Sequence, residues 1–512
     1  FLFNPGSINP NEYMEALQPL VDWKNISGRP TTMVGVSETG TLDDLKKYVE
    51  GVYLNNPNFK YLLLVGEHEN LPASQLSGGR SDNYYGMLEG NDYYEEILVG
   101  RLPVISVQDA ENQVAKTIYY ERNIDETATW ATRAVGIGAD EGAGLGHFGE
   151  ADYVHMDYIR DTLMHYTYTE VSQHYAGLNN PTASNMITDF NTGATVANYC
   201  NHGSPTSWAV ANFTNSNVHQ LTNDYRWPFI WSVACNNGQF DYEECFGEAW
   251  MRAKNNTTGV PTGAIGGMFS WISQPWLPPM YGQDEMNAIL TEWRDGYKHT
   301  LGGVSINGNQ YVLDMAPGDA GSTHNTWLLF GDPSLMVRTD VPQDMNVTAS
   351  PSVLLLGMTS LTVNADAEFG IATLSIDGEP IASAYVNNGV AELSFASLSN
   401  VGTAKLVVMG YNKVTTEMDI MINPAEGAFL VNDGYALNDD NGQLDYGENI
   451  KLSINVENVG VEQANDISVE LTTDSEYITL NDNTETIDAI AAGETITLEE
   501  AFDFDVASNV PD

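Results

Sequence analysis

Residues 228–238 read PFIWSVACNNG, an apolar run that ends in Cys235 and is followed by polar turn residues. A second apolar run, ATVANYC at 194–200, ends in the same way, with His202 just beyond it. Short apolar runs bounded by turn residues are typical of buried strands in a parallel sheet. In open parallel α/β sheets, ligands bind outside the carboxyl ends of the strands. If the two strands are neighbours, Cys235 and His202 lie side by side at that edge.

The alternation of short apolar runs with amphipathic stretches continues to about residue 340. Further candidate strands are 61–65 (YLLLV), 96–100 (EILVG), 133–138 (RAVGIG) and 262–269 (TGAIGGMF). Helical periodicity occurs at 41–53, 106–122, 150–165, 243–254 and 282–294. This pattern predicts an α/β fold with a mainly parallel sheet flanked by helices. We assign residues 1–120 and 121–342 to two α/β subdomains.

The pattern changes after the segment TWLLFGDPSLMVRTDVP (326–342), where period-two alternation replaces helical periodicity, as in LTVNA and AELSF. This alternation predicts an immunoglobulin-like β-sandwich at 343–424. A second β-rich unit, 425–512, contains KLSINVENVG and ISVELTT. The pattern stops abruptly at Asp512, so we expect this last domain to be partial.

The chain is strongly acidic, with 20 Lys and Arg residues against 69 Asp and Glu residues and a formal net charge of −49. Such a field repels phosphate backbones and anionic lipid headgroups, which disfavours nucleic-acid binding. It attracts calcium and basic peptides. The carboxylates are spread along the whole chain, which is typical of a solvated surface in a salty or extracellular medium.

Three cysteines occur, Cys200, Cys235 and Cys245, which are too few for a disulfide framework. They form no C-x-x-C pair of the metal-binding type. At least one of them is therefore expected to be a free thiol.

Neither a membrane anchor nor a leader is expected from the sequence. It has no run of about 18 apolar residues, so we expect no transmembrane segment. The first residues lack the basic and then apolar profile of a signal peptide, and we interpret the chain as a processed or trimmed form.

Cys235 and His202 together have the chemistry of nucleophilic catalysis. A thiol becomes an effective nucleophile when a neighbouring base or cation favours the thiolate, and an imidazole supplies such a group. Gly203 allows a carbonyl group to approach closely, so the backbone N–H groups of Gly203 and Cys235 can stabilise an oxyanion. Taken alone, a cysteine after an apolar strand is more often a small buried side chain, and a histidine is more often structural. Because two residues of complementary chemistry follow two strand ends, the catalytic interpretation is as well supported as the structural one.

The segments around these two residues resemble the gingipains, a family of cysteine peptidases with a caspase-like fold. The resemblance is closest to the arginine-specific members and covers nearly all of residues 20 to 420. The stretches that carry it are ANYCNHGSPTSWA (197–209), SVACNNGQFDYEECFGEAWMRA (232–253), VDWKNISGR (21–29), YLLLVGEHENLPA (61–73), SDNYYGMLEGNDYYEEILVGR (81–101), YYERN (119–123), PPMYGQDEMNAIL (278–290), FGDPSL (330–335) and GYNKVT (410–415).

The resemblance implies a role for each residue of the predicted site. It makes Cys235 the nucleophile, His202 its proton-transfer partner, and the backbone amides of Gly203 and Cys235 the oxyanion hole. It also makes Glu141, in GADEGAG, the acid that orients the histidine.

This chain departs from the arginine-specific members just before the histidine, where Cys200 replaces a hydroxyl residue and Asn201 replaces a glycine. Both departures lie in the segment that leads directly to His202. Cys245 matches a structural position of the family.

A pocket for arginine needs a carboxylate to meet the guanidinium and apolar walls along its stem. The resemblance places Asp152 at the floor of this pocket and Trp276 and Met280 in its walls. In the lysine-specific relative the position of Met280 is acidic, so methionine favours arginine over lysine. Without the resemblance, ordinary core packing would be the interpretation of the tryptophan and the methionine.

The family also implies structural calcium, for which oxygen ligands are suited. Candidate ligands are Asp82, Asp92 and Glu96. A second acidic loop, NDDNGQLDYGE (438–448), resembles calcium loops of extracellular β-domains through Asp439, Asn441, Asp445 and Glu448. It lacks the EF-hand spacing, and an acidic β-turn is an equal alternative. No organic cofactor is expected.

The sequence therefore predicts a secreted cysteine endopeptidase that hydrolyses protein or peptide substrates after a basic residue, arginine in preference to lysine. The resemblance further implies a bacterial extracellular or cell-surface location reached by type IX export. Two alternatives remain: a transpeptidase or sortase-like member of the same fold, and an inactive adhesion or binding protein. The presence of both His202 and Cys235 argues against the inactive alternative.

Overall fold

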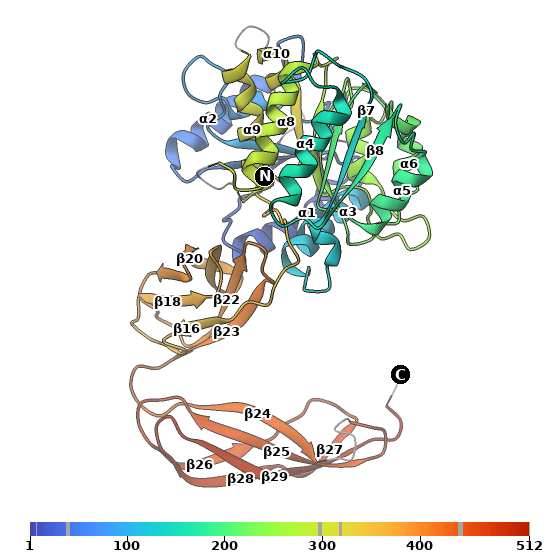
Figure 1. Ribbon diagram of the computed structural model, residues 1–512. Helices are drawn as coiled ribbons and strands as arrows, with labels where there is room; N and C mark the ends of the chain where they lie inside the picture. Colours follow the sequence, from blue (N-terminus) through green and yellow to red (C-terminus); the bar gives the residue numbers. More distant parts are fainter. Residues whose placement is uncertain (7, 37–40, 295–298, 317–319, 439–443, 511–512) are drawn as a thin grey trace.

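A ten-stranded sheet organises the N-terminal α/β region (Figure 1). The computed structural model describes residues 1–6, 8–36, 41–294, 299–316, 320–438 and 444–510. Across the sheet the strands are β2 (Val34–Gly35), β1 (Leu2–Phe3), β3 (Tyr61–Val65), β6 (Leu98–Leu102), β15 (Trp327–Gly331), β14 (Gly266–Ser270), β13 (Phe229–Val233), β9 (Val196–Cys200), β7 (Arg133–Ala139) and β8 (Glu170–Ala176). The β14–β15 pairing is antiparallel, and the other pairings along this order are parallel. Two parallel halves thus run in opposite directions, and the prediction of a mainly parallel sheet is confirmed.

Helices cover both faces of the sheet. One buried cluster includes side chains of α1 (Pro10–Ile26), α3 (Val107–Arg122), α5 (Ala183–Thr192) and α7 (Phe246–Arg252). A second includes side chains of α4 (Asp152–Met164), α8 (Leu277–Leu290) and α9 (Leu301–Met315). Within β13, Ile230 belongs to the first cluster and its neighbour Trp231 to the second. Because both faces are covered, this strand is apolar along nearly its whole length.

The remaining α-helices and strands complete the α/β region. They are α2 (Leu42–Asn55), α6 (Asn215–Val218), α10 (Ala320–Thr326), β4 (Ser74–Leu76), β5 (Gly79–Ser81), β10 (Gly203–Ser204), β11 (Ser207–Trp208) and β12 (Phe213–Thr214). Within the described ranges, no helix is both long enough and apolar enough to cross a membrane.

Several element boundaries differ from the sequence prediction. The helix expected at 282–294 begins at Leu277, because Pro278 and Pro279 occupy its first turn, where a missing N–H is tolerated. Helix α9 was not predicted, since its glycines lower intrinsic helix propensity. One of them, Gly308, lies against Met286 of α8, where a Cβ would come within 2.4 Å of that side chain. Close helix packing therefore explains this glycine.

The α/β sheet is followed by two β-rich bodies (Figure 1). The first is an eight-stranded arrangement around its own buried cluster. Its strands, in order, are β16 (Val347–Ser350), β18 (Ser360–Ala365), β21 (Val390–Ser394), β20 (Glu379–Asn387), β19 (Phe369–Ile376), β22 (Gly402–Gly410), β23 (Thr416–Asn423) and β17 (Leu354–Leu355). The second comprises β24 (Leu430–Asn438), β25 (Asn449–Asn458), β29 (Thr495–Val506) and β27 (Ile478–Asp482), with a separate pair β26 (Ala464–Glu470) and β28 (Thr484–Ile490).

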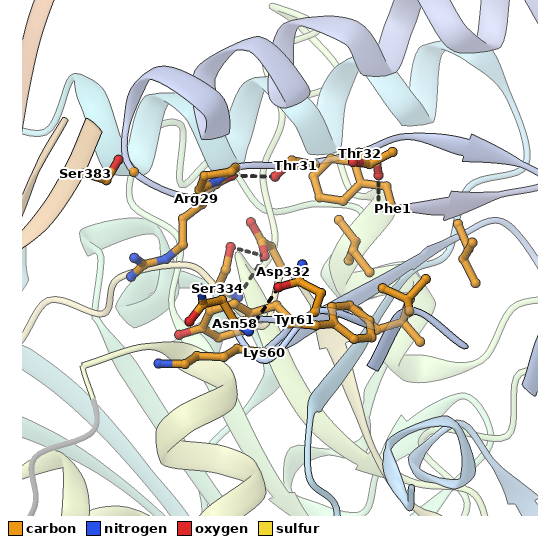
Figure 2. A pocket seen from close by; sticks show the side chains of 18 of the residues that line it. Phe1, Arg29, Thr31, Thr32, Asn58, Lys60, Tyr61, Asp332, Ser334 and Ser383 are labelled. Carbon is orange, nitrogen blue, oxygen red and sulfur yellow. Dashed lines mark hydrogen bonds between the residues drawn. The ribbon is translucent and has the colours of Figure 1, made fainter. Parts of the chain in front are cut away.

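The first β-body packs directly on the α/β region. A buried cluster joins Trp23 of α1 to Ile371 and Val407 of the sandwich. Arg122 forms an ion pair with Glu417 across the same boundary. A cavity of about 440 Å³ also lies there, lined by Arg29, Lys60 and Tyr61 among others (Figure 2). None of the predicted catalytic residues lines this cavity.

A buried ion network connects α1, near the start of the α/β region, with α3 and with the segment after β15, near its end. The Nζ atom of Lys24 in α1 lies 2.9 Å from Oε1 of Glu121 in α3 and 2.7 Å from Oδ2 of Asp332, which follows β15. The indole N–H of Trp23 also donates to Glu121, at 2.8 Å. Removing the cation would leave two buried carboxylates without the ion pair that they share.

We therefore expect Lys24→Ala to lower the free energy of unfolding by about 3–5 kcal/mol, the usual effect of breaking a buried ion pair. Urea denaturation followed by tryptophan fluorescence measures this change. The control is Lys47→Ala on the exposed face of α2, which should change stability by about 0.5 kcal/mol or less. A loss below about 1 kcal/mol for Lys24→Ala would contradict the proposed importance of this network.

Candidate functional site

Strands β9 and β13 are direct neighbours, as the sequence predicted. They pair in parallel, with Val233 opposite Cys200. His202 and Cys235 follow the carboxyl ends of these strands and line one cavity of about 180 Å³. The complete lining is Cys200, Asn201, His202, Val233, Ala234, Cys235, Gln274, Pro275 and Trp276.

Gly203 allows the two strand ends to approach each other. A Cβ at this position would lie 2.8 Å from the carbonyl oxygen of Cys235 and 2.8 Å from Cβ of Ala234. Those distances are shorter than normal carbon contacts, so any larger residue would separate the histidine segment from the cysteine segment. Glycine is therefore required here by packing as well as by the expected approach of a substrate.

Asn237, which the sequence analysis did not single out, fastens the loop after Cys235. Its Nδ2 donates to the carbonyl oxygens of Ser204, at 2.7 Å, and Ser207, at 3.1 Å. Its Oδ1 accepts from the hydroxyl of Ser232, at 2.9 Å. The side chain is fully buried. It thus joins the β10–β11 hairpin that follows His202 to the loop that carries Cys235, a link between segments that lie far apart in the sequence.

His202 lies between an acid and an aromatic ring. Its Nε2 is 3.5 Å from Oε2 of Glu141, which follows β7, and both side chains are more than half exposed. Its ring is perpendicular to that of Trp276, with centroids 5.1 Å apart. The Sγ atom of Cys235 lies 3.8 Å from the carbonyl oxygen of Gln274. The structure therefore gathers the predicted nucleophile, histidine and acid around a single opening.

Asp152 lies at the N-terminus of α4 and has no exposed surface. Its Oδ2 accepts from Nδ2 of Asn201, at 2.8 Å, and its Oδ1 accepts from the indole N–H of Trp276, at 2.8 Å. Burial raises the pKa of the Asp152 carboxyl, and these two hydrogen bonds act in the opposite direction. The predicted pocket acid is thus adjacent to the cavity, covered by Asn201 and Trp276.

Met280, predicted as a pocket wall, is fully buried in the core cluster beneath β9 and β13. It is not among the residues that line the cavity. In this structure Met280 is part of the buried face of α8. Trp276 immediately precedes the first residue of that helix.

His155 joins α4 to α8 behind the pocket acid. Its Nε2 is 3.1 Å from Oε1 of Gln283, and its Nδ1 is 3.6 Å from Glu150 and 3.5 Å from Asp284. Burial opposes protonation of this histidine, but the charge of Asp284 and the hydrogen bonds to Glu150 and Gln283 outweigh it and raise the pKa. His155 thus connects α4, which begins at Asp152, to α8, which Trp276 directly precedes.

The predicted calcium ligands near residue 90 are not gathered into one group. Both oxygens of Asp82 accept hydrogen bonds from the buried guanidinium of Arg101, each at 2.7 Å. Oε2 of Glu96 accepts from the backbone N–H groups of Leu88 and Glu89. Oδ1 of Asp92 accepts from the N–H of Tyr94. Asp82 thus serves a buried ion pair in this structure, and calcium binding by these residues stays a prediction.

The other predicted calcium loop lies partly outside the described residues, which do not include Asp439 and Asn441. Oε2 of Glu448 accepts from the backbone N–H of Asp445, at 3.2 Å. Elsewhere in the described ranges, Glu67, His68 and Glu69 place ligand atoms within 4.8 Å of one another. Glu67 already pairs with Arg252, so this group is explained in part by an ion pair.

Comparisons with known proteins agree with this geometry. Residues 7–338 match the model of peptidase family C25, and residues 349–423 match the C-terminal ig-like domain of that family. The chain belongs to peptidase family C25. The predicted resemblance and the predicted fold, an α/β peptidase region followed by an immunoglobulin-like sandwich, are thereby confirmed.

The relatives include peptidases of known name. The chain is 39% identical to Gingipain R2 of Porphyromonas gingivalis over 83% of its own length and 58% of that protein. It is 24% identical to Lys-gingipain W83 of the same species over 80% of its own length and 25% of that protein. The crystal structure of the Arg specific cysteine proteinase gingipain R matches 82% of this chain and 97% of that chain, with a TM-score of 0.77 and 38% identity. The chain thus spans a little over half of Gingipain R2, as the 58% coverage states.

The environments of the three thiols predict their reactivity. Cys200 and Cys245 are fully buried, and burial raises the pKa of both well above the usual value. Cys235 is partly exposed and lines the cavity. We expect one equivalent of iodoacetamide to modify Cys235 in the native protein, because only an accessible thiolate reacts quickly.

Peptide mapping by mass spectrometry measures this selectivity. In urea, all three cysteines should react, which provides the internal control. Faster native modification of Cys200 or Cys245 than of Cys235 would contradict the assignment.

Proposed function

We propose that this member of family C25 is a cysteine endopeptidase that hydrolyses peptide bonds after arginine. One observation carries the proposal: Cys235 and His202 line a single cavity, behind which a carboxylate, Asp152, is buried. A thiol beside an imidazole supports acyl transfer, and a buried carboxylate supports recognition of a cation. Protein and peptide chains are the substrates of this proposal.

The proposed reaction is acyl transfer in two steps. The thiolate of Cys235 attacks the carbonyl carbon of the basic residue, and the backbone N–H groups of Gly203 and Cys235 stabilise the oxyanion. Protonated His202 gives its proton to the departing amine, which leaves a thioester on Cys235. Water, deprotonated by His202, then releases the carboxylic acid and restores the thiol. Glu141, whose Oε2 is 3.5 Å from Nε2 of His202, orients the imidazole.

Arginine is proposed over lysine for two reasons. A planar guanidinium can form two parallel hydrogen bonds to one carboxylate, whereas an ammonium makes a point contact. The second reason is similarity, since the chain is 39% identical to Gingipain R2 but 24% identical to Lys-gingipain W83. The fully buried Met280 contributes an apolar base beneath the site, with no second acid at that position.

We also propose, by similarity to these relatives, that the protein acts outside a bacterial cell, as a secreted or surface-bound enzyme exported by a type IX system. The acidic surface, with a net charge of −49, supports such a location and favours encounter with basic peptides.

The arginine proposal predicts the effect of Asp152→Asn. Loss of the buried counter-charge should lower kcat/KM for arginine peptides by ~30-fold to ~5000-fold, the equivalent of about 2–5 kcal/mol. The measurement uses matched fluorogenic peptides ending in Arg, Lys, Ala and Asp. Arginine should be cleaved fastest by the wild type, and the loss should be confined to basic substrates.

Two variants control this experiment. Asp161→Asn lies on the exposed face of the same helix and should leave kcat/KM unchanged. Cys235→Ala should abolish cleavage of every peptide. Equal cleavage after arginine and lysine by the wild type would contradict the arginine assignment, and products joined to an added amine instead of water would indicate a transpeptidase.

We further propose that calcium binds the loop 438–448, with Asp439, Asn441, Asp445 and Glu448 as candidate ligands. Clustered carboxylates repel one another unless a cation binds them, so a chelator should lower the melting temperature of the protein. Asp445→Asn with Glu448→Gln should abolish the response to the chelator, while the exposed Asp474→Asn in the same domain should retain it. An unchanged melting temperature after metal removal, verified by elemental analysis, would rule out this site.

A further inference from the structure

Asn201 contacts two carboxylates at once. Its Nδ2 donates to Oδ2 of Asp152, at 2.8 Å, and to Oε2 of Glu141, at 3.1 Å. The same oxygen of Glu141 lies 3.5 Å from Nε2 of His202. One side-chain amide therefore connects the acid beneath the cavity to the acid that faces the histidine.

The position of Asn201 is fixed by the sheet. It follows β9 directly, and its backbone N–H donates to the carbonyl oxygen of Val233 in β13, at 3.2 Å. Its side chain is only 8% exposed. The backbone N–H of Asp152 also donates to the carbonyl oxygen of Glu141, at 3.0 Å, so the two acids are held close together. Both donor hydrogens of this amide are thus committed before any substrate binds.

The charged groups around this amide explain why the two acids need a donor. Besides Glu141, the groups facing Asp152 are His155 on its own helix and the side chains of Cys200 and Tyr199 on β9. Glu150 and Asp284 lie behind His155. His202 faces Glu141 from the other side. Burial and the charge of Glu141 both disfavour ionisation of Asp152, while the hydrogen bonds from Asn201 and Trp276 favour it.

We propose that Asn201 is a positioning residue that sets the strength of the arginine pocket and orients the catalytic histidine, by holding Asp152 and Glu141 with one amide. Through Asp152 it favours the charged form of the pocket carboxylate and holds its Oδ2 directly behind the cavity wall. Through Glu141 it fixes the acid that orients His202. The proposal rests on the proposed peptidase function, and it assigns to the residue before the histidine a role in both substrate binding and turnover.

The pocket half of the proposal is tested without catalysis, by the binding of agmatine, a free guanidinium compound, to the full chain. Binding requires ionised Asp152, so it is present above the pKa of that carboxyl and is lost as pH falls through it. Asn201→Ala removes a donor to the charged form and raises this pKa further. Affinity measured by calorimetry should therefore disappear at a pH about one unit or more above that of the wild type.

The catalytic half is tested with arginine peptides. Asn201→Ala should raise KM by about 10-fold through Asp152 and also lower kcat through Glu141. Trp276→Phe is the matched comparison, because it removes the other side-chain donor to Asp152 and leaves the hydrogen bond from Asn201 to Glu141 in place. It should raise KM and shift the agmatine profile.

Two more variants separate this role from a structural one. Asn217→Ala removes a partly buried capping side chain of α6, whose Oδ1 accepts from Thr214, and should lower stability without moving either profile. Asn201→Ser retains one donor and should fall between wild type and Asn201→Ala, which keeps the test readable if the alanine variant does not fold. Unchanged agmatine binding across pH in either Asn201 variant would overturn the proposal. Absence of peptide cleavage by the wild type would instead refute the peptidase function and leave the agmatine result interpretable.

Discussion

The parallel pairing of β9 with β13 is the constraint on which the site depends. Its register places Val233 opposite Cys200, so the segments that carry His202 and Cys235 leave the sheet at the same level. Beyond the strands, Gly203 lies against the carbonyl oxygen of Cys235, and Asn237 fastens the following hairpin. A slip in register would move one segment along the other and separate the histidine from the cysteine. Strand pairing thus sets the geometry that the proposed chemistry requires.

The burial of the pocket acid is the second constraint, because burial makes ionisation of a carboxylate unfavourable. An isolated carboxylate without exposed surface favours its neutral form, which cannot attract a guanidinium. The structure opposes this tendency with the N-terminus of α4 and with neutral donors from Asn201 and Trp276. His155 further fixes α4 against α8. The pocket therefore depends on helix packing and on hydrogen bonds from two separate segments.

Local sequence patterns could predict the strand ends because a polar residue after an apolar run is visible without knowledge of contacts. The resemblance added Glu141 and Asp152, which look like any of the other acids when read singly. Asn237 and Gln274 were missed, since their partners become neighbours only when distant loops fold together. The same reason explains why the carboxylate of Asp82 looked like a calcium ligand. Its partner, Arg101, lies on β6 and becomes its neighbour only in the folded chain. Composition gives no sign of which carboxylates will be paired.

Trp276 contacts both the pocket acid, Asp152, and the predicted catalytic histidine, His202. Asp152 has no exposed surface, and the indole N–H of Trp276 donates to it, so the pocket is closed in this structure. The same indole ring lies perpendicular to the ring of His202, 5.1 Å away. Any movement of the indole that exposes the carboxylate therefore also changes a contact of the histidine. Pocket entry and the histidine environment are consequently coupled by a shared side chain, in addition to the amide of Asn201.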